Sequence, residues 1–388
     1  MEKGNVLVIG NSGVGKSTLI NAVLGKEYAK TSWGPVGTTG ELELYEVDDV
    51  PFRIIDTVGF EPSFIKARQA ISAVKKWSRK SAKNDHENSG INVIWFCVDG
   101  TSRKLFPKSI KDLSKATAMW KSVPLVVVIT KSYSVPEREQ NIEMVNSVFA
   151  KEKIFSENLR KIVPVVASPY VLNDTAYAPP DGILELIDIT NEVMPEGVKG
   201  GAKDIAKFKL TRKRALSQTT VGAATVAGVV VGAVPIPFSD ALLLGPTEGV
   251  MFNALAQIYE VNKEEKSKQL INSMVQAGTV GVAAKITLSS LKAIPGINLA
   301  VSVLNAIVAG VMIALLGEAS IYIFEQVYLG NRSVTDIDWV TKIIESKFAS
   351  EFPEKIDLLL ERMSDKTDNN SIVKNILNLF KSGSKKVE

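Results

Sequence analysis

The segment Gly10–Ser17, with the sequence GNSGVGKS, constrains the fold of this chain more than any other. It has the spacing of a phosphate-binding loop, in which glycines precede a lysine and a hydroxyl residue. The apolar run Asn5–Ile9 before it predicts a buried strand, and Thr18–Leu24 after it predicts a helix. Glycines let the backbone N–H groups of such a loop face phosphates, and the helix N-terminus adds a positive dipole.

We therefore predict that this loop binds the phosphates of a nucleoside triphosphate, with Mg²⁺ as the cofactor. Lys16 would reach the β- and γ-phosphates, and the Ser17 hydroxyl would ligate Mg²⁺. A glycine-rich turn without a ligand is the alternative, and it explains the spacing and the context less well. The predicted nucleotide-binding residues here are Asn11, Ser12, Gly13, Val14, Gly15, Lys16, Ser17 and Thr18.

The N-terminal half alternates apolar runs with stretches of helical length. That order predicts an α/β domain with a mostly parallel sheet flanked by helices, and it places functional loops at the carboxyl ends of strands. The further predicted strands are Phe52–Ile55, Val93–Val98, Leu125–Ile129 and Ile162–Val166.

Two short motifs indicate a switch around the γ-phosphate. Asp56–Gly59 follows a predicted strand, so Asp56 would hold Mg²⁺ through water and the Gly59 N–H would contact the γ-phosphate. The loop Gly37–Gly40 supplies Thr38 and Thr39, either of which could ligate Mg²⁺ only while the γ-phosphate is present.

Together these motifs resemble the Era-like branch of the translation-factor-class (TRAFAC) P-loop GTPases, over about residues 4–170. The resemblance implies that Thr39 is the switch ligand, with Thr38 the alternative, and that Lys16 and Thr39 are the catalytic residues. The run Ile91–Gly100 is similar to the fourth strand of a subgroup whose GTPase domain is fused to a hydrophobic helical domain of the YcjF type. The pattern Pro235-x-Pro237-x-x-Asp240 is similar to that helical domain.

The base-binding motif departs from the family. Thr130 and Lys131 fit it, but Tyr133 stands where the family has the aspartate that accepts two hydrogen bonds from guanine. Lys131 could still pack along the base, and Ser168 could supply the last base contact. An ordinary strand-end loop is the alternative for these residues. Guanine preference is therefore implied by the resemblance.

The hydrolytic machinery also departs from the family. Phe60 cannot orient water, and Gly13 replaces the asparagine with which some relatives hold a potassium ion. We predict a GTPase with slow turnover that self-association or a partner stimulates. The alternative is a scaffold that binds a nucleoside triphosphate, or an NTPase of relaxed base specificity.

A basic stretch follows Phe60. It predicts an amphipathic helix, which is either a solvated surface helix or a switch-linked face for a membrane or an acidic partner. Its basic residues are Lys66, Arg68, Lys75, Lys76, Arg79, Lys80 and Lys83.

The 388-residue length and a change of composition near Gly197–Gly201 predict several domains. We expect the GTPase domain over 1–197, the hydrophobic helical domain over 198–330, and C-terminal helices that pack on it over 331–388. The predicted C-terminal helices are about 335–349, 354–364 and 371–381.

The runs 215–239 and 293–317 contain no charged residue, and each is long enough to cross a bilayer. A basic cluster from Lys207 to Arg214 would suit the cytosolic side. The many small residues, such as Gly228 and Gly232, fit a soluble helical bundle equally well. Membrane association and a soluble bundle remain the two alternatives.

The remaining composition limits partners and location. Cys97 lies in an apolar run, so we expect a buried, inert thiol in a reducing compartment, and the early first strand leaves no room for a signal peptide. A net charge of +4 does not favour nucleic acid. The predicted partners are GTP or GDP, a second copy through the GTPase domain, and a membrane or protein through the helical domain. The predicted location is the cytoplasm, with the inner face of the membrane as an option.

Overall fold

The structure, a computed structural model, describes residues 3–25, 42–47, 50–57, 72, 90–102, 123–151, 158–173, 176–233, 245–261, 265–280, 299–364 and 366–383. Contacts divide the chain into two compact units. The first comprises Met1–Ser168 and Pro180–Lys213, and the second comprises Pro169–Pro179 and Arg214–Glu388. The predicted domain boundary at residue 197 rests on composition and stays a prediction. The pattern around Pro235 lies outside the described residues.

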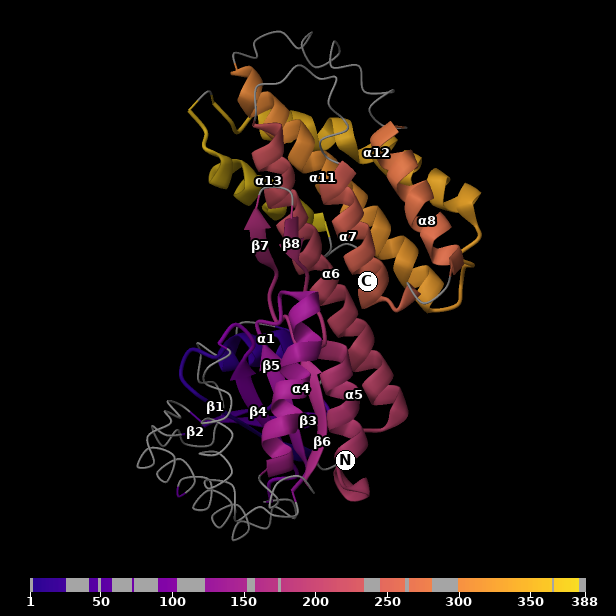
Figure 1. Ribbon diagram of the computed structural model, residues 1–388. Coiled ribbons are helices and arrows are strands. Elements are labelled where there is room, and N and C mark those ends of the chain that lie inside the picture. The colour runs from indigo at the N-terminus through magenta and orange to yellow at the C-terminus, as the bar shows by residue number, and fades with distance from the viewer. Residues whose placement is uncertain are drawn as a thin grey trace. The chain divides into compact units, whose positions relative to one another are not determined.

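Among the described residues, six strands form the sheet of the first unit, in the order β2-β3-β1-β4-β5-β6 (Figure 1). β2 runs antiparallel to β3, and the other neighbouring strands are parallel, which confirms the predicted α/β fold. The strands are β1 Gly4–Gly10, β2 Leu42–Tyr45, β3 Phe52–Thr57, β4 Val93–Asp99, β5 Leu125–Thr130 and β6 Leu159–Pro164.

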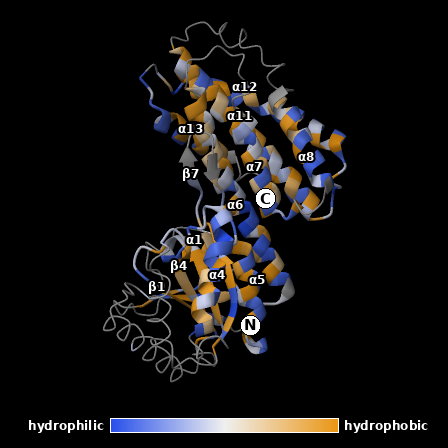
Figure 2. Ribbon diagram, in the orientation of Figure 1, coloured by the Kyte–Doolittle hydropathy of each residue, from blue (hydrophilic) through white to orange (hydrophobic). Residues whose placement is uncertain are grey.

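Both faces of the sheet are covered, as its nearly continuous apolar strands require. Helix α4 (Val135–Lys151) buries Phe149 against one face, beside Phe96 of β4. On the other face, the indole N–H of Trp95 donates a 2.9 Å hydrogen bond to Thr190 of α5 (Ile183–Val193). The apolar colouring of the labelled strands β1 and β4 in Figure 2 shows this core. Cys97 is buried within it, as expected, and burial raises the pKa of its thiol to about 12.

The second unit is a helical bundle built around α11 (Val301–Tyr328). Nearly every residue from Val303 to Phe324 is buried, and α7, α12 and α13 pack on this helix. The other elements are α6 Ala202–Gly232, α7 Gly245–Ile258, α8 Glu265–Val275, the π-helical turn η5 Gln276–Val280, α12 Ile337–Leu360, α13 Asn369–Gly383, and the hairpin of β7 Tyr170–Asn173 and β8 Ala176–Ala178. The division between the two units falls within α6, which the 3-10 turn η2 (Glu196–Val198) precedes.

Helices α6 and α11 pack closely through glycines. A Cβ added to Gly317 would lie 2.4 Å from Val221 Cγ1, and one added to Gly232 would lie 2.6 Å from Ala309 Cβ. Residue numbers rise along one helix as they fall along the other, so the pair is antiparallel. At one end, Arg214 donates hydrogen bonds of 2.7 and 2.6 Å to the two carboxylate oxygens of Glu325. Glycine packing and a bidentate ion pair therefore set the register of these helices.

In the part of the chain that the structure describes, two helices are long and apolar enough to cross a membrane: Lys203–Gly232 of α6 and Val301–Tyr328 of α11. In their most apolar windows, 50% of the α6 residues and 89% of the α11 residues are buried inside the protein. The core helix of a soluble bundle passes the same test of length and composition. The membrane alternative rests on this weak indication alone.

The basic cluster before the first apolar run does not form an exposed patch. Lys209 pairs with Asp188 at 2.7 Å, and Lys213 is fully buried. The Arg212 guanidinium is also buried, 5.7 Å from the centre of the Phe208 ring. Lys207 and Arg214 are exposed, but Arg214 pairs with Glu325, so most of these charges have partners within the protein.

The tail differs from the prediction in one respect. The two helices expected at 335–349 and 354–364 are a single helix, α12, with Pro353 inside it. Proline costs a helix about 3 kcal/mol. Phe348, Phe352 and Ile356 are buried on either side of it, and their packing outweighs that cost.

Candidate functional site

The phosphate-binding loop leaves the carboxyl end of the central strand β1 and enters helix α1 (Lys16–Leu24). Gly13 and Gly15 have φ of 78° and 98°, in the left-handed region that favours glycine. Gly10 lies so close to β4 that an added Cβ would sit 2.5 Å from the Cys97 carbonyl oxygen. The predicted strand, loop and helix are confirmed, and each of these glycines has a physical reason.

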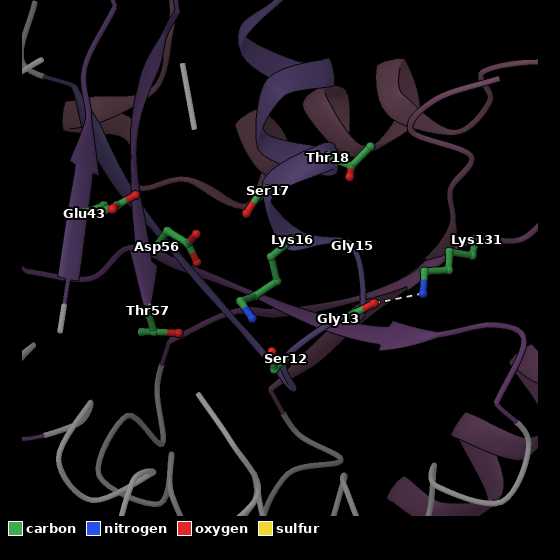
Figure 3. Close-up of a pocket in the computed structure, with 10 residues that line it drawn as sticks. All are labelled: Ser12, Gly13, Gly15, Lys16, Ser17, Thr18, Glu43, Asp56, Thr57 and Lys131. Atoms are coloured by element: carbon green, nitrogen blue, oxygen red, sulfur yellow. Dashed lines mark hydrogen bonds between the residues drawn. The ribbon is translucent and has the colours of Figure 1, made fainter. Parts of the chain in front are cut away.

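Beside the loop lies a cavity of about 490 Å³ (Figure 3). Five segments meet there: the loop, α1, the paired strands β2 and β3, and the residue that follows β5. The lining residues are Ser12, Gly13, Gly15, Lys16, Ser17, Thr18, Glu43, Asp56, Thr57 and Lys131.

The Lys16 side chain contacts the backbone of the loop that precedes it. Its ammonium group donates hydrogen bonds to the carbonyl oxygens of Gly10, at 2.8 Å, and Asn11, at 3.1 Å. Lys16 is 8% exposed and lines the cavity, so its charge is available to phosphates that enter there.

Asp56 lies near the end of β3 and lines the same cavity as Ser17, which stands in the first turn of α1 (Figure 3). Asp56 is 5% exposed. Burial raises the pKa of its carboxyl to about 6; the Lys16 charge opposes this rise and the Glu43 charge adds to it. Its Oδ1 atom makes no hydrogen bond to any residue that the structure describes.

A buried carboxylate oxygen without a partner is unfavourable unless a cation or a donor reaches it. Within the described ranges, no group of three His, Cys, Asp or Glu side chains could hold a metal ion by itself. The Ser17 hydroxyl and the Asp56 carboxylate line one cavity, and they are ligand types that Mg²⁺ prefers.

Residues at the end of β5 hold the loop from the other side. The Thr130 hydroxyl lies within hydrogen-bonding distance of the carbonyl oxygens of Val14 and Val98. Lys131, at φ 54°, donates a 2.8 Å hydrogen bond to the Gly13 carbonyl oxygen. Thr130 is 2% exposed and does not line the cavity, so its observed contacts are structural.

The structure brings together only some of the predicted residues. Asn11, Val14 and Ser168 are outside the cavity lining, and Ser168 is exposed at a bend beyond β6. Thr38, Thr39 and Gly59 lie outside the described residues, as do Phe60 and the basic stretch that follows it. The role of each predicted residue stays a prediction.

Two acidic residues at the site have no counterpart in the sequence prediction. Glu43 of β2 lines the cavity, and Asp99 of β4 pairs with Lys131 at 2.6 Å. Neither residue belongs to a short motif, so spacing could not identify them. Asp99 directly follows the predicted strand Val93–Val98 and is the last residue of the observed β4, and that position alone could have indicated it.

Two separate stretches of the chain match known families. Residues 5–131 match the family described as 50S ribosome-binding GTPase, and residues 205–347 match a domain of unknown function, DUF697. The GTPase Era of Clostridium botulinum (strain Alaska E43 / Type E3) is 26% identical over 212 residues, which are 53% of this chain and 60% of that protein. The probable GTP-binding protein EngB of Desulfovibrio desulfuricans is 29% identical over 168 residues, or 43% and 75% of the two chains.

A crystal structure of Era in complex with MgGDPNP and a segment of 16S ribosomal RNA is also similar. It is 19% identical, with a TM-score of 0.30, and the match covers 59% of this chain and 68% of that one. This chain thus spans 60% of the first of these Era proteins and about two thirds of the other.

Proposed function

We propose that this chain, an Era-like P-loop GTPase domain fused to a helical domain, binds GTP and GDP with Mg²⁺ beside Lys16 and hydrolyses GTP slowly. One observation carries the proposal. The buried Asp56 Oδ1 lacks a partner among the described residues, and it lines the same cavity as Lys16 and Ser17. A phosphate-bound cation at this point would satisfy the carboxylate, and Lys16 would neutralise the phosphates.

In this proposal, the loop residues from Asn11 to Thr18 bind the phosphates through backbone N–H groups and the Lys16 ammonium. Ser17, Thr39 and Asp56 hold Mg²⁺, and Thr38 is the alternative to Thr39. The Gly59 N–H contacts the γ-phosphate. When bound, the ion spreads the negative charge that develops on the phosphates during transfer.

Hydrolysis joins a water oxygen to the γ-phosphorus and breaks the bond from that phosphorus to the bridging oxygen, which leaves GDP and inorganic phosphate. Lys16 and the loop N–H groups stabilise the oxygen that leaves. Phe60 follows Gly59 and offers no group to orient the water. We therefore propose slow turnover, which a second copy of the GTPase domain or another partner accelerates.

The residues expected to contact the nucleotide base suggest a second candidate function. Tyr133 replaces the expected carboxylate, so recognition of guanine would rest on Lys131 along the base and on Ser168. A site without that carboxylate discriminates less between guanine and other bases. The second candidate is therefore a nucleotide-dependent scaffold or NTPase of relaxed base specificity.

The proposed output is the helical domain. Helix α6 contains residues of both units, because the division between them falls between Lys213 and Arg214. A change in the first unit on nucleotide binding could therefore be passed to the second unit along this helix. We propose that this route controls a surface for a membrane or a protein partner. The proposed location is the cytoplasm, including the inner face of the membrane.

Titration of the nucleotide-free chain with GTP, ATP and XTP, each with excess Mg²⁺, tests both candidates. The first predicts tighter binding of GTP than of the other two, and the second predicts similar affinities. Phosphate release measured at rising protein concentration tests the slow turnover. A rate that is fast and independent of concentration would contradict it.

A further inference from the structure

Glu43 of strand β2 lines the same cavity as Asp56 and Ser17, the proposed ligands of Mg²⁺. Strands β2 and β3 are antiparallel, and Glu43 and Asp56 are partners in their register. Side chains of such partners leave the sheet on the same side. Figure 3 shows both side chains at the cavity that they line with Lys16. The site therefore holds a second carboxylate besides the one in the Asp56–Gly59 motif.

A neighbour on the same strand holds the Glu43 side chain. The Tyr45 hydroxyl donates a hydrogen bond to Glu43 Oε2. Tyr45 is 7% exposed, and burial together with this hydrogen bond raises the pKa of its phenol well above its usual range. The hydroxyl thus stays a donor, and one carboxylate oxygen is fixed in place.

Among the described lining residues, the charges are close to balanced before any ligand arrives. Lys16 and Lys131 contribute two positive charges, while Glu43 and Asp56 contribute two negative ones when both are ionised. Lys131 is already paired with Asp99, so Lys16 is the lining cation that remains for phosphates. Phosphates that enter beside two carboxylates are repelled unless a divalent cation enters with them.

Glu43 differs from Asp56 in its hydrogen bonding and in its burial. Asp56 has a buried oxygen without a partner in the described part of the chain, so it is the direct candidate for the ion. Glu43 has one oxygen fixed by Tyr45 and is less buried. These contacts suit a residue that acts by its charge and through water, beyond the first ligands of the ion.

We propose that Glu43 is a positioning residue that makes nucleotide binding strictly dependent on a divalent cation. Its charge disfavours phosphates when no cation is bound, and it stabilises the cation when phosphates are bound. This inference rests on the proposed nucleotide binding and deepens it. It separates two roles: Lys16 and the loop set the affinity for phosphate, and Glu43 sets how far that affinity depends on Mg²⁺.

The test is a ratio of affinities. Dissociation constants for fluorescent GDP are measured in excess Mg²⁺ and in EDTA, for the full chain and for Glu43→Gln. Glutamine keeps the size of the side chain and an oxygen that accepts from Tyr45, so this variant removes the charge alone. The ratio compared is the dissociation constant in EDTA divided by the dissociation constant in Mg²⁺. We expect Glu43→Gln to lower this ratio by about tenfold, because GDP binding strengthens in EDTA and weakens in Mg²⁺.

Glu46→Gln is the matched control. Glu46 follows β2, is exposed, lies outside the cavity lining and pairs with Arg53 at 3.1 Å. Its ratio should match that of the unchanged chain. An equal ratio for Glu43→Gln would overturn the inference and leave the proposed function standing. A chain that binds no nucleotide even in Mg²⁺ would overturn the proposed function itself.

Tyr45→Phe checks the role of the hydroxyl. If Glu43 acts by a fixed charge, this variant should give a ratio between those of the unchanged chain and of Glu43→Gln. If Glu43 served only to satisfy Tyr45, Glu43→Gln would leave the ratio unchanged. Thermal unfolding midpoints of all variants show whether each one folds.

Discussion

The Lys131 ammonium joins the phosphate-binding loop to β4, because it donates hydrogen bonds to the Gly13 carbonyl oxygen and to Asp99 Oδ2, at 2.8 and 2.6 Å. Asp99 also accepts from the Thr101 hydroxyl and N–H. Partial burial raises the pKa of the Asp99 carboxyl, but the hydrogen bonds from Lys131 and Thr101 outweigh it and hold the pKa below its usual range. Asp99 is therefore charged at neutral pH and fixes the lysine against the loop.

Asp99→Asn should weaken GDP binding by about three- to tenfold, because a neutral acceptor holds Lys131 less firmly and the loop then loses part of its support. Fluorescent GDP titration in excess Mg²⁺ measures the change. Asp188→Asn is the control, since it removes an acidic partner of Lys209 outside the site. Unchanged affinity in Asp99→Asn would show that the loop holds its shape without this ion pair.

Asp56 predicts a pH dependence of stability in the nucleotide-free chain. Its folded pKa of about 6 lies above the ordinary value of 3.8, so the folded state binds the proton more tightly than the unfolded state. This contribution to the free energy of unfolding is complete below pH 4 and is lost as the pH rises through about 6.

Asp56→Asn should therefore raise the free energy of unfolding of the GTPase domain by about 1–3 kcal/mol at pH 7.5, with little gain at pH 4. Chemical denaturation without nucleotide, at both pH values, measures it. The same variant should lose Mg²⁺-dependent nucleotide binding. A variant no more stable at pH 7.5 than the unchanged chain would indicate that water solvates the carboxylate.

Gly25 ends α1 with φ of 80°, and its N–H donates a 2.7 Å hydrogen bond to the Asn21 carbonyl oxygen. An added Cβ would overlap the Arg212 guanidinium of α6. Gly25→Ala should lower the free energy of unfolding of the GTPase domain by about 2–4 kcal/mol, of which about 1–2 kcal/mol is backbone strain.

A second variant separates the two causes in Gly25→Ala. In an Arg212→Ala background the overlap is absent, so the same substitution should cost only the strain. Chemical denaturation of the four chains in this cycle gives the coupling between the two positions. Equal costs in both backgrounds would mean that the guanidinium moves aside.

Gly317 tests the packing of α6 on α11. Gly317→Ala should destabilise the helical unit by about 1–3 kcal/mol, because the β-branched Val221 cannot easily move away. Gly249→Ala in α7 is the control, since nothing lies within 4 Å of an added Cβ there, and it should be neutral or stabilising by up to about 1 kcal/mol. Urea denaturation compares them, and equal effects would rule out close packing at Gly317.

The parallel strands β1, β3, β4 and β5 were predictable because each is a run of apolar residues. The last predicted strand, Ile162–Val166, is also present, but it is shifted to Leu159–Pro164 because its first half carries the exposed Arg160 and Lys161. Strand β2 was not predicted, since its four residues Leu42–Tyr45 are too few for a clear pattern. The hairpin of β7 and β8 is equally short. The sequence predicts two helices where the structure has the single helix α12, because Pro353 normally interrupts a helix. Sequence alone cannot show the aromatic packing that stabilises α12 around this proline.

Some residues of the candidate site could likewise be predicted from the sequence, and others could not. Two short motifs, Gly10–Ser17 and Asp56–Gly59, identify the loop together with Lys16, Ser17 and Asp56. Glu43 and Asp99 become neighbours of that loop only through strand pairing, which spacing does not encode. Lys131 was predicted to pack along a base, and the structure adds its hydrogen bond to Gly13.

The most direct test of the account is calorimetric titration of Mg²⁺–GTP into the nucleotide-free chain and into Lys16→Ala. Lys151→Ala is the control, because this exposed lysine ends α4 away from the cavity. The unchanged chain and Lys151→Ala should both bind the nucleotide, and Lys16→Ala should bind it with an affinity about a hundredfold lower. Equal affinity for all three chains would contradict this prediction, because the nucleotide would then bind somewhere other than the phosphate-binding loop.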